Sequence, residues 1–122
     1  MTKLLIKVPY VLVQPTENGI QYIDKYIELD GEKRADKINQ LFKTIDSAIT
    51  EKSSILLYRQ DIKRASDQLS GKSISSKEIF TLIKSRIRAN YEVLKLTFDP
   101  RTLQFNGYKT AFIIHKRIRE LD

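Results

Sequence analysis

The feature that constrains the fold most is a run of apolar residues at helical spacing in the middle of the chain. Steps of three and four residues link Ala35, Ile38, Phe42, Ile45 and Ile49. The same spacing returns in Ile55, Tyr58, Ile62, Ala65 and Leu69, and again in Ile79, Phe80, Ile83, Ile87 and Tyr91. An amphipathic helix buries such a stripe and leaves its other side in water. The pattern therefore predicts three successive helices, over about 32–50, 54–69 and 76–91.

Capping residues mark the boundaries of these predicted helices. Glu32 would place a carboxylate near the positive end of the first helix. Ser70-Gly71 is a stop signal for the second helix, because glycine readily ends a helix. Ser75 and Glu78 form the capping-box pattern ahead of the third helix.

The segments on either side favour β-strands. Residues 3–13 are rich in Val, Leu and Ile, and Pro9 indicates an edge strand or a bulge. Asn18-Gly19 is a turn signal, and the alternation over 20–29 predicts the returning strand of an N-terminal β-hairpin. After the third helix, Leu94, Leu96 and Phe98 alternate with polar residues, which is typical of a half-buried strand. A short segment, 103–105, is expected to pair back on it.

The sequence after residue 108 is compatible with either a helix or a strand. Ala111, Ile114, Ile118 and Leu121 fit a helix, whereas Phe112-Ile113-Ile114 alone fits a strand. We favour the helix because bases near the end of the chain suit its negative C-terminus. The expected fold is one α+β domain over 1–122, with an N-terminal β-hairpin, three amphipathic helices, short C-terminal strands and a terminal helix.

Composition argues against several classes of function. The chain has no cysteine and one histidine, His115, which disfavours disulfides, thiolate metal sites and most histidine-based catalytic or zinc sites. No apolar run approaches the roughly 20 residues that span a bilayer. We therefore predict no metal, no cofactor, no membrane and no enzymatic activity. The expected location is the cytoplasm, or the interior of a virion or infected host cell.

A hydrolase is the least favoured alternative. A divalent-metal nuclease needs two or three carboxylates near a lysine, and Asp24 and Glu28 with Lys33 offer a partial match. Asp30 and Glu32 already have structural explanations as a turn residue and a helix-end residue. No second acidic cluster follows downstream, so the match stays incomplete.

The net charge is confined to one half of the chain. Residues 1–62 carry 9 Lys or Arg and 9 Asp or Glu, so this half is neutral. Residues 63–122 carry 13 bases and 6 acids, so the whole formal charge of +7 lies in this half. A one-sided cationic half raises the local electrostatic potential and attracts polyanions.

This asymmetry predicts a non-enzymatic accessory protein of a nucleoprotein assembly, which contacts DNA or RNA phosphates with weak sequence preference. Binding of this kind weakens steeply as salt rises. On the third helix Lys77, Lys84 and Arg88 share one stripe. The candidate phosphate-binding residues are Lys77, Lys84, Arg86, Arg88, Lys116, Arg117 and Arg119.

The alternative function is a small protein-binding structural or inhibitory component, such as a viral or mobile-element assembly factor. Its basic face would then meet an acidic protein surface. The predicted hairpin has apolar residues on both faces, and only one face can pack on the helices. Its candidate interface residues are Tyr10, Tyr22 and Tyr26. The helical stripes also leave a homo-oligomer open, although packing within one chain accounts for them.

Overall fold

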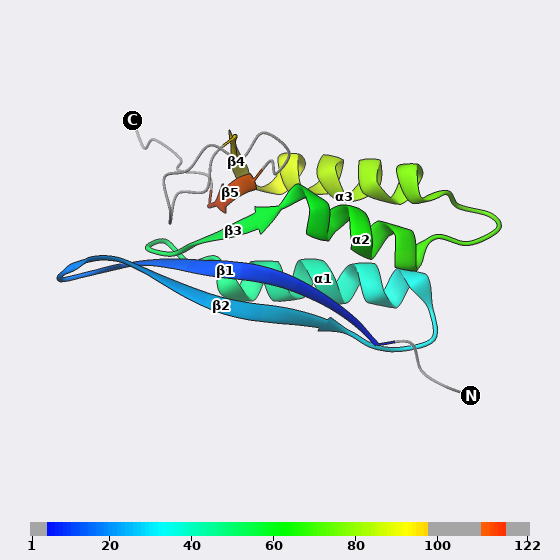
Figure 1. Ribbon diagram of the computed structural model, residues 1–122, viewed down its shortest axis with the longest axis horizontal. Helices are drawn as coiled ribbons and strands as arrows, with labels where there is room; N and C mark the ends of the chain where they lie inside the picture. The colour runs from blue at the N-terminus through cyan, green and yellow to red at the C-terminus, as the bar shows by residue number, and fades with distance from the viewer. Residues whose placement is uncertain (1–4, 98–110, 117–122) are drawn as a thin grey trace.

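The described part of this computed structural model, residues 5–97 and 111–116, forms a five-stranded antiparallel sheet and three helices (Figure 1). The strand order in the sheet is β2-β1-β3-β5-β4. The elements follow one another as β1 (Ile6–Thr16), β2 (Gly19–Leu29), α1 (Arg34–Ala48), β3 (Ser54–Tyr58), α2 (Arg59–Leu69), α3 (Ser76–Asn90), β4 (Glu92–Leu96) and β5 (Ala111–His115). The α+β prediction is confirmed.

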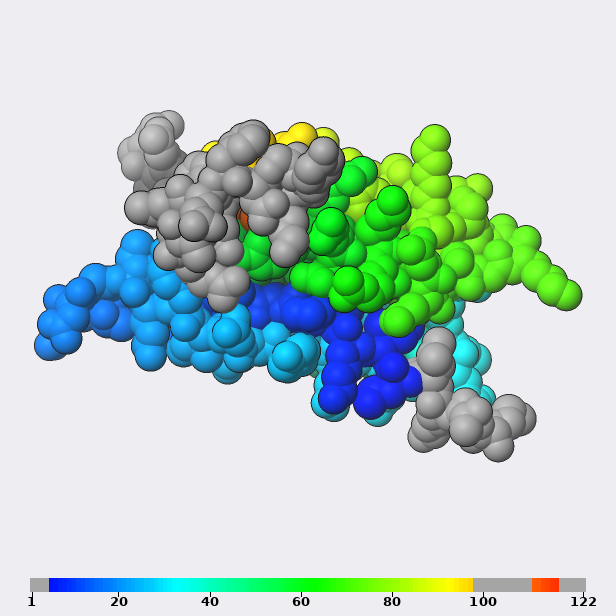
Figure 2. Space-filling view, in the orientation of Figure 1, coloured from blue at the N-terminus to red at the C-terminus, as the bar shows by residue number. Residues whose placement is uncertain are grey.

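The predicted N-terminal hairpin is present, with its first strand three residues later than expected. β1 and β2 pair from Ile6 and Leu29 at one end to Thr16 and Gly19 at the other. Gly19 has φ +127°, a conformation that side-chain-bearing residues rarely adopt. Pro9 lies outside the short part of β1 that pairs with β3. In the space-filling view the hairpin projects from one end of the molecule, and the α2–α3 connection projects from the other (Figure 2).

The first part of the second predicted helix is wrong, because residues 54–58 form β3 in the middle of the sheet. Ile55 and Leu57 pack on the helix side of the sheet, and Leu56 packs on the opposite side. A central strand buries side chains on both faces and therefore reads as a continuous apolar run. The helical spacing is correct only from Arg59, where α2 begins.

The first and third helices were predicted correctly, with small differences at their ends. α1 begins at Arg34, two residues later than expected. At the start of α3 the Ser75 hydroxyl accepts a hydrogen bond from the Glu78 amide at 3.2 Å, as the capping box predicted. The stripe of α3 that packs on the sheet consists of Ile79, Ile83 and Ile87.

The favoured terminal helix is wrong over 111–115, which form β5 between β3 and β4. Phe112 and Ile114 face the helices while Ala111 and Ile113 face the other side, so this short segment also has the two-sided burial of an inner strand. The predictions for 98, 103–105 and 117–121 lie outside the described residues.

The strand predicted around Leu94 is confirmed as β4, but its orientation differs from the expectation. Val93 packs into the main core, whereas Leu94 points away from the helices and is 54% exposed. Because side chains alternate along a strand, Lys95 lies on the same face as Val93, towards the helices. This orientation brings Lys95 to the side of the sheet where the helices and their basic residues lie.

The helices pack on one face of the sheet, where residues of all three join the main hydrophobic core. α2 and α3 form an antiparallel pair joined by a short connection (Figure 1). Within the described residues, no helix is both long and apolar enough to cross a membrane.

Candidate nucleic-acid interface

The buried stripe of α3 separates its basic residues into two groups. Lys84 and Arg88 lie one turn apart, and Lys77 lies two turns before Lys84 on the same side. Arg86 lies about 200° around the helix from Lys84, which is the opposite side. We call Lys77, Lys84 and Arg88 the cationic flank of α3. The structure thus brings together three of the four candidate residues on this helix.

The Phe80 ring contacts two cationic side chains where α2 and α3 pack together. The guanidinium carbon of Arg59 lies 5.2 Å from the centre of the Phe80 ring. The Lys84 ammonium nitrogen lies 5.1 Å from the same ring. The negative face of an aromatic ring attracts cations, so this contact fixes a residue of α2 beside the cationic flank.

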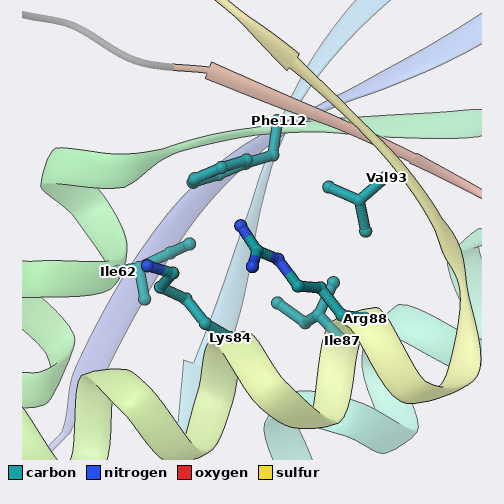
Figure 3. Close-up of a pocket in the computed structure, with 6 residues that line it drawn as sticks. All are labelled: Ile62, Lys84, Ile87, Arg88, Val93 and Phe112. Carbon is teal, nitrogen blue, oxygen red and sulfur yellow. The ribbon is translucent and has the colours of Figure 1, made fainter.

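A hollow opens where α2 and α3 meet the end of the sheet. It is lined by Ile62, Lys84, Ile87, Arg88, Val93 and Phe112 (Figure 3). In this view the Arg88 side chain extends from α3 towards the Phe112 ring, and Lys84 lies one turn earlier on the helix. The hollow offers about 10 Å³ to a water-sized sphere, so it holds about one water molecule.

A second and larger hollow adjoins the first. It has a volume of about 270 Å³ and is lined by Arg88, Tyr91, Glu92, Val93, Lys95 and Phe112. Three of these residues also line the first hollow, so the two are parts of one depression. We call it the α3–β4 groove. Tyr91 and Phe112 are mostly buried in its floor, and Lys84, Arg88 and Lys95 supply its positive charge.

Arg86 is kept away from this groove by contacts with α1. Its guanidinium carbon lies 4.1 Å from the centre of the Phe42 ring. Its Nη1 donates a hydrogen bond to Asn39 Oδ1 at 3.3 Å. These contacts give Arg86 a position between two helices, separate from the cationic flank.

The candidate residues near the end of the chain are only partly described. Lys116 is exposed and directly follows β5. His115 pairs with Glu92, the first residue of β4, so the backbone of Lys116 lies near the C-terminus of α3. His115 makes a local contact of 2.9 Å between its Nδ1 and the Lys116 carbonyl oxygen. Arg117 and Arg119 lie outside the described residues.

Lys95 was not among the predicted site residues, because the alternation of apolar and polar residues in β4 suggests that its side chain faces solvent. The sequence suggests that Leu94 and Leu96 face the core, which would send Lys95 to solvent. Because Val93 faces the core instead, Lys95 lies on the helix side and lines the groove. The signal that could have found it is the apolar residue Val93, three residues after the end of α3.

The three candidate interface tyrosines do not share one face. Tyr10 packs into the main core on the helix side, and its burial raises the pKa of its hydroxyl. Tyr22 packs against the apolar cluster on the other face of the sheet. Tyr26 is 63% exposed and lies on the same face as Tyr22, four residues along β2.

The acidic residues considered for metal binding do not gather into a site. Across residues 5–97 and 111–116, no three His, Asp or Glu side chains lie close enough together to hold a metal ion. Asp30 instead has a structural contact, since Gln40 hydrogen-bonds to its backbone amide and carbonyl at 3.0 and 2.9 Å.

Comparison with known proteins gives no functional lead. No protein-family model, curated protein or solved structure matches the chain at a significant level.

Proposed function

We propose that this chain is a non-enzymatic accessory protein of a nucleoprotein assembly, which binds nucleic-acid phosphates through the cationic flank of α3. The observation that supports this proposal is the convergence of cations from two elements around one depression. Lys84 and Arg88 come from α3 and Lys95 from β4. Arg59 of α2 shares the Phe80 ring with Lys84. Lys116 adds a further base near the end of α3.

The physical basis is the release of counterions from the nucleic acid. Each phosphate that a Lys or Arg neutralises frees condensed cations, which drives binding and makes it sensitive to salt. Phosphate contacts carry no sequence information, so the proposed binding has weak sequence preference.

The second candidate function is a protein-binding structural or inhibitory component. The observation that favours it is the sheet face opposite the helices, where Tyr26 and Leu94 are 63% and 54% exposed. These two residues lie on opposite edge strands, but the same face also carries an apolar cluster with partly buried members, Val13, Tyr22, Tyr58, Leu96 and Ile113. A contiguous apolar patch on a surface often marks a protein interface. In that case the cationic flank would meet an acidic protein surface.

Charge reversal tests the proposal. The double variant Lys84→Glu/Arg88→Glu should bind a fluorescent DNA or RNA oligonucleotide at least about tenfold more weakly than the wild type at about 50 mM salt. The matched control is Lys7→Glu/Lys33→Glu, which changes the net charge equally at two exposed residues of the neutral half. Fluorescence anisotropy gives both affinities.

The two functions predict different outcomes. Equal losses in the two double variants would show that net charge alone matters and would overturn the assignment to α3. Wild-type protein that binds poly-glutamate but neither oligonucleotide would support the acidic-protein alternative instead.

A further inference from the structure

The α3–β4 groove combines two kinds of lining that phosphate binding alone does not require. Ile87, Val93 and the Phe112 ring make part of it apolar. The remainder holds two bases, Arg88 and Lys95, and one acid, Glu92, so its net charge is positive. A ligand that matches both has a flat apolar part next to negative charge.

The dimensions of the groove decide which part of it a ligand can enter. The inner hollow holds only about one water molecule, so the ligand must enter the outer one. The outer hollow, at about 270 Å³, approaches the roughly 300–1,000 Å³ of small-molecule pockets. A single nucleobase is a ligand of suitable size and shape.

Two cations line this hollow and a third lies beside it. Arg88 of α3 and Lys95 of β4 line the outer hollow, and Lys84 of α3 lines the adjoining inner one. A nucleic-acid backbone that passes along the opening would bring its phosphates near these residues while one base turns inwards. Bases inside a duplex are stacked and paired, so they cannot enter without being extruded.

We infer that the α3–β4 groove binds single-stranded nucleic acid by accepting one unpaired base against Phe112 and Val93, with the flanking phosphates on Lys84, Arg88 and Lys95. The inference rests on the proposed function and adds the ligand class to it. Stacking of a base on aromatic side chains strengthens binding by roughly tenfold per base, which is enough to separate this mode from phosphate binding.

An abasic oligonucleotide separates the two contributions because it keeps the phosphates and lacks the bases. The wild type should bind a thymidine oligonucleotide of about 12 nucleotides roughly tenfold more tightly than the abasic strand of equal length. Equal affinity for the two strands would overturn the inference and leave the proposed function intact. Absence of binding to both strands at about 50 mM salt would overturn the proposed function itself.

Filling the groove provides a second test that preserves its charge. Val93→Phe should reduce the affinity for the thymidine strand to that for the abasic strand, and leave the latter unchanged. Leu94→Phe is the matched control, because this neighbouring residue lies on the other face of β4 and is exposed. If circular dichroism shows that Val93→Phe does not fold, the wild-type affinities for the thymidine and abasic strands still test the inference.

Discussion

At the scale of single residues, Arg86 and Arg88 show how two neighbouring bases acquire different roles. Both belong to the same basic segment and differ by two positions. Arg86 contacts Phe42 and Asn39 of α1, whereas Arg88 lines the groove. The sequence identifies both as basic residues of one helix, but it does not tell which flank meets another helix. That depends on how α1 packs, which is a contact between distant parts of the chain.

These positions predict opposite effects of truncation. Arg86→Ala should lower the free energy of unfolding by about 1 kcal/mol, because it removes a cation–π contact and the packing of the side-chain stem. Its affinity for an oligonucleotide should stay within about twofold of the wild type. Urea unfolding and fluorescence anisotropy measure the two effects.

Arg88→Ala is the comparison for this prediction. It should weaken binding and reduce the slope of log affinity against log salt by roughly one, as expected for the loss of one phosphate contact. If Arg86→Ala weakened binding as much as Arg88→Ala, the division of α3 into two flanks would have no functional meaning.

At the scale of elements, the sequence predicts the hairpin through its Asn18-Gly19 turn. It predicts α1 and α3 well because each has one buried face. One-sided burial leaves a clear period of 2 or 3.6 residues in the sequence. β3 and β5 are buried on both faces, so that period disappears and a helical spacing can arise by chance. Ile55 and Tyr58 fitted the stripe of the following helix, although both belong to a strand. The prediction of the site residues missed Lys95 for a related reason, because the apolar alternation of β4 suggests the wrong orientation for that strand.

The two-sided burial of β3 can be tested by truncation. Leu56→Ala should cost about 2–5 kcal/mol of unfolding free energy, as much as Ile55→Ala, because both side chains are 0% exposed. In a helix only one of these adjacent residues would face the core. The control is Leu94→Ala, where an exposed side chain should cost under about 0.5 kcal/mol.

Chemical denaturation of the three variants gives these free energies. A loss at Leu56 as small as that at Leu94 would contradict the arrangement of β3 as a central strand.

At the scale of the whole molecule, the topology concentrates charge that the sequence distributes over many positions. The strand order places β4 and β5 at one end of the sheet and the hairpin of the neutral half at the other. α3 leads directly into β4, so Lys84 and Arg88 of the cationic flank lie near Lys95 at that end. The sequence predicts the asymmetry of charge between the halves, and the fold converts it into an asymmetry between the two ends of the sheet.

The central claim is that these cations neutralise phosphates, and the salt dependence of binding measures this most directly. Three or four single-strand phosphate contacts predict a slope of log affinity against log salt of about −2 to −3. Affinity should therefore fall by roughly 20- to 50-fold between about 50 and 200 mM salt, and Lys84→Glu/Arg88→Glu should at least halve the slope. A wild-type slope near zero, or an unchanged slope in this variant, would contradict the account.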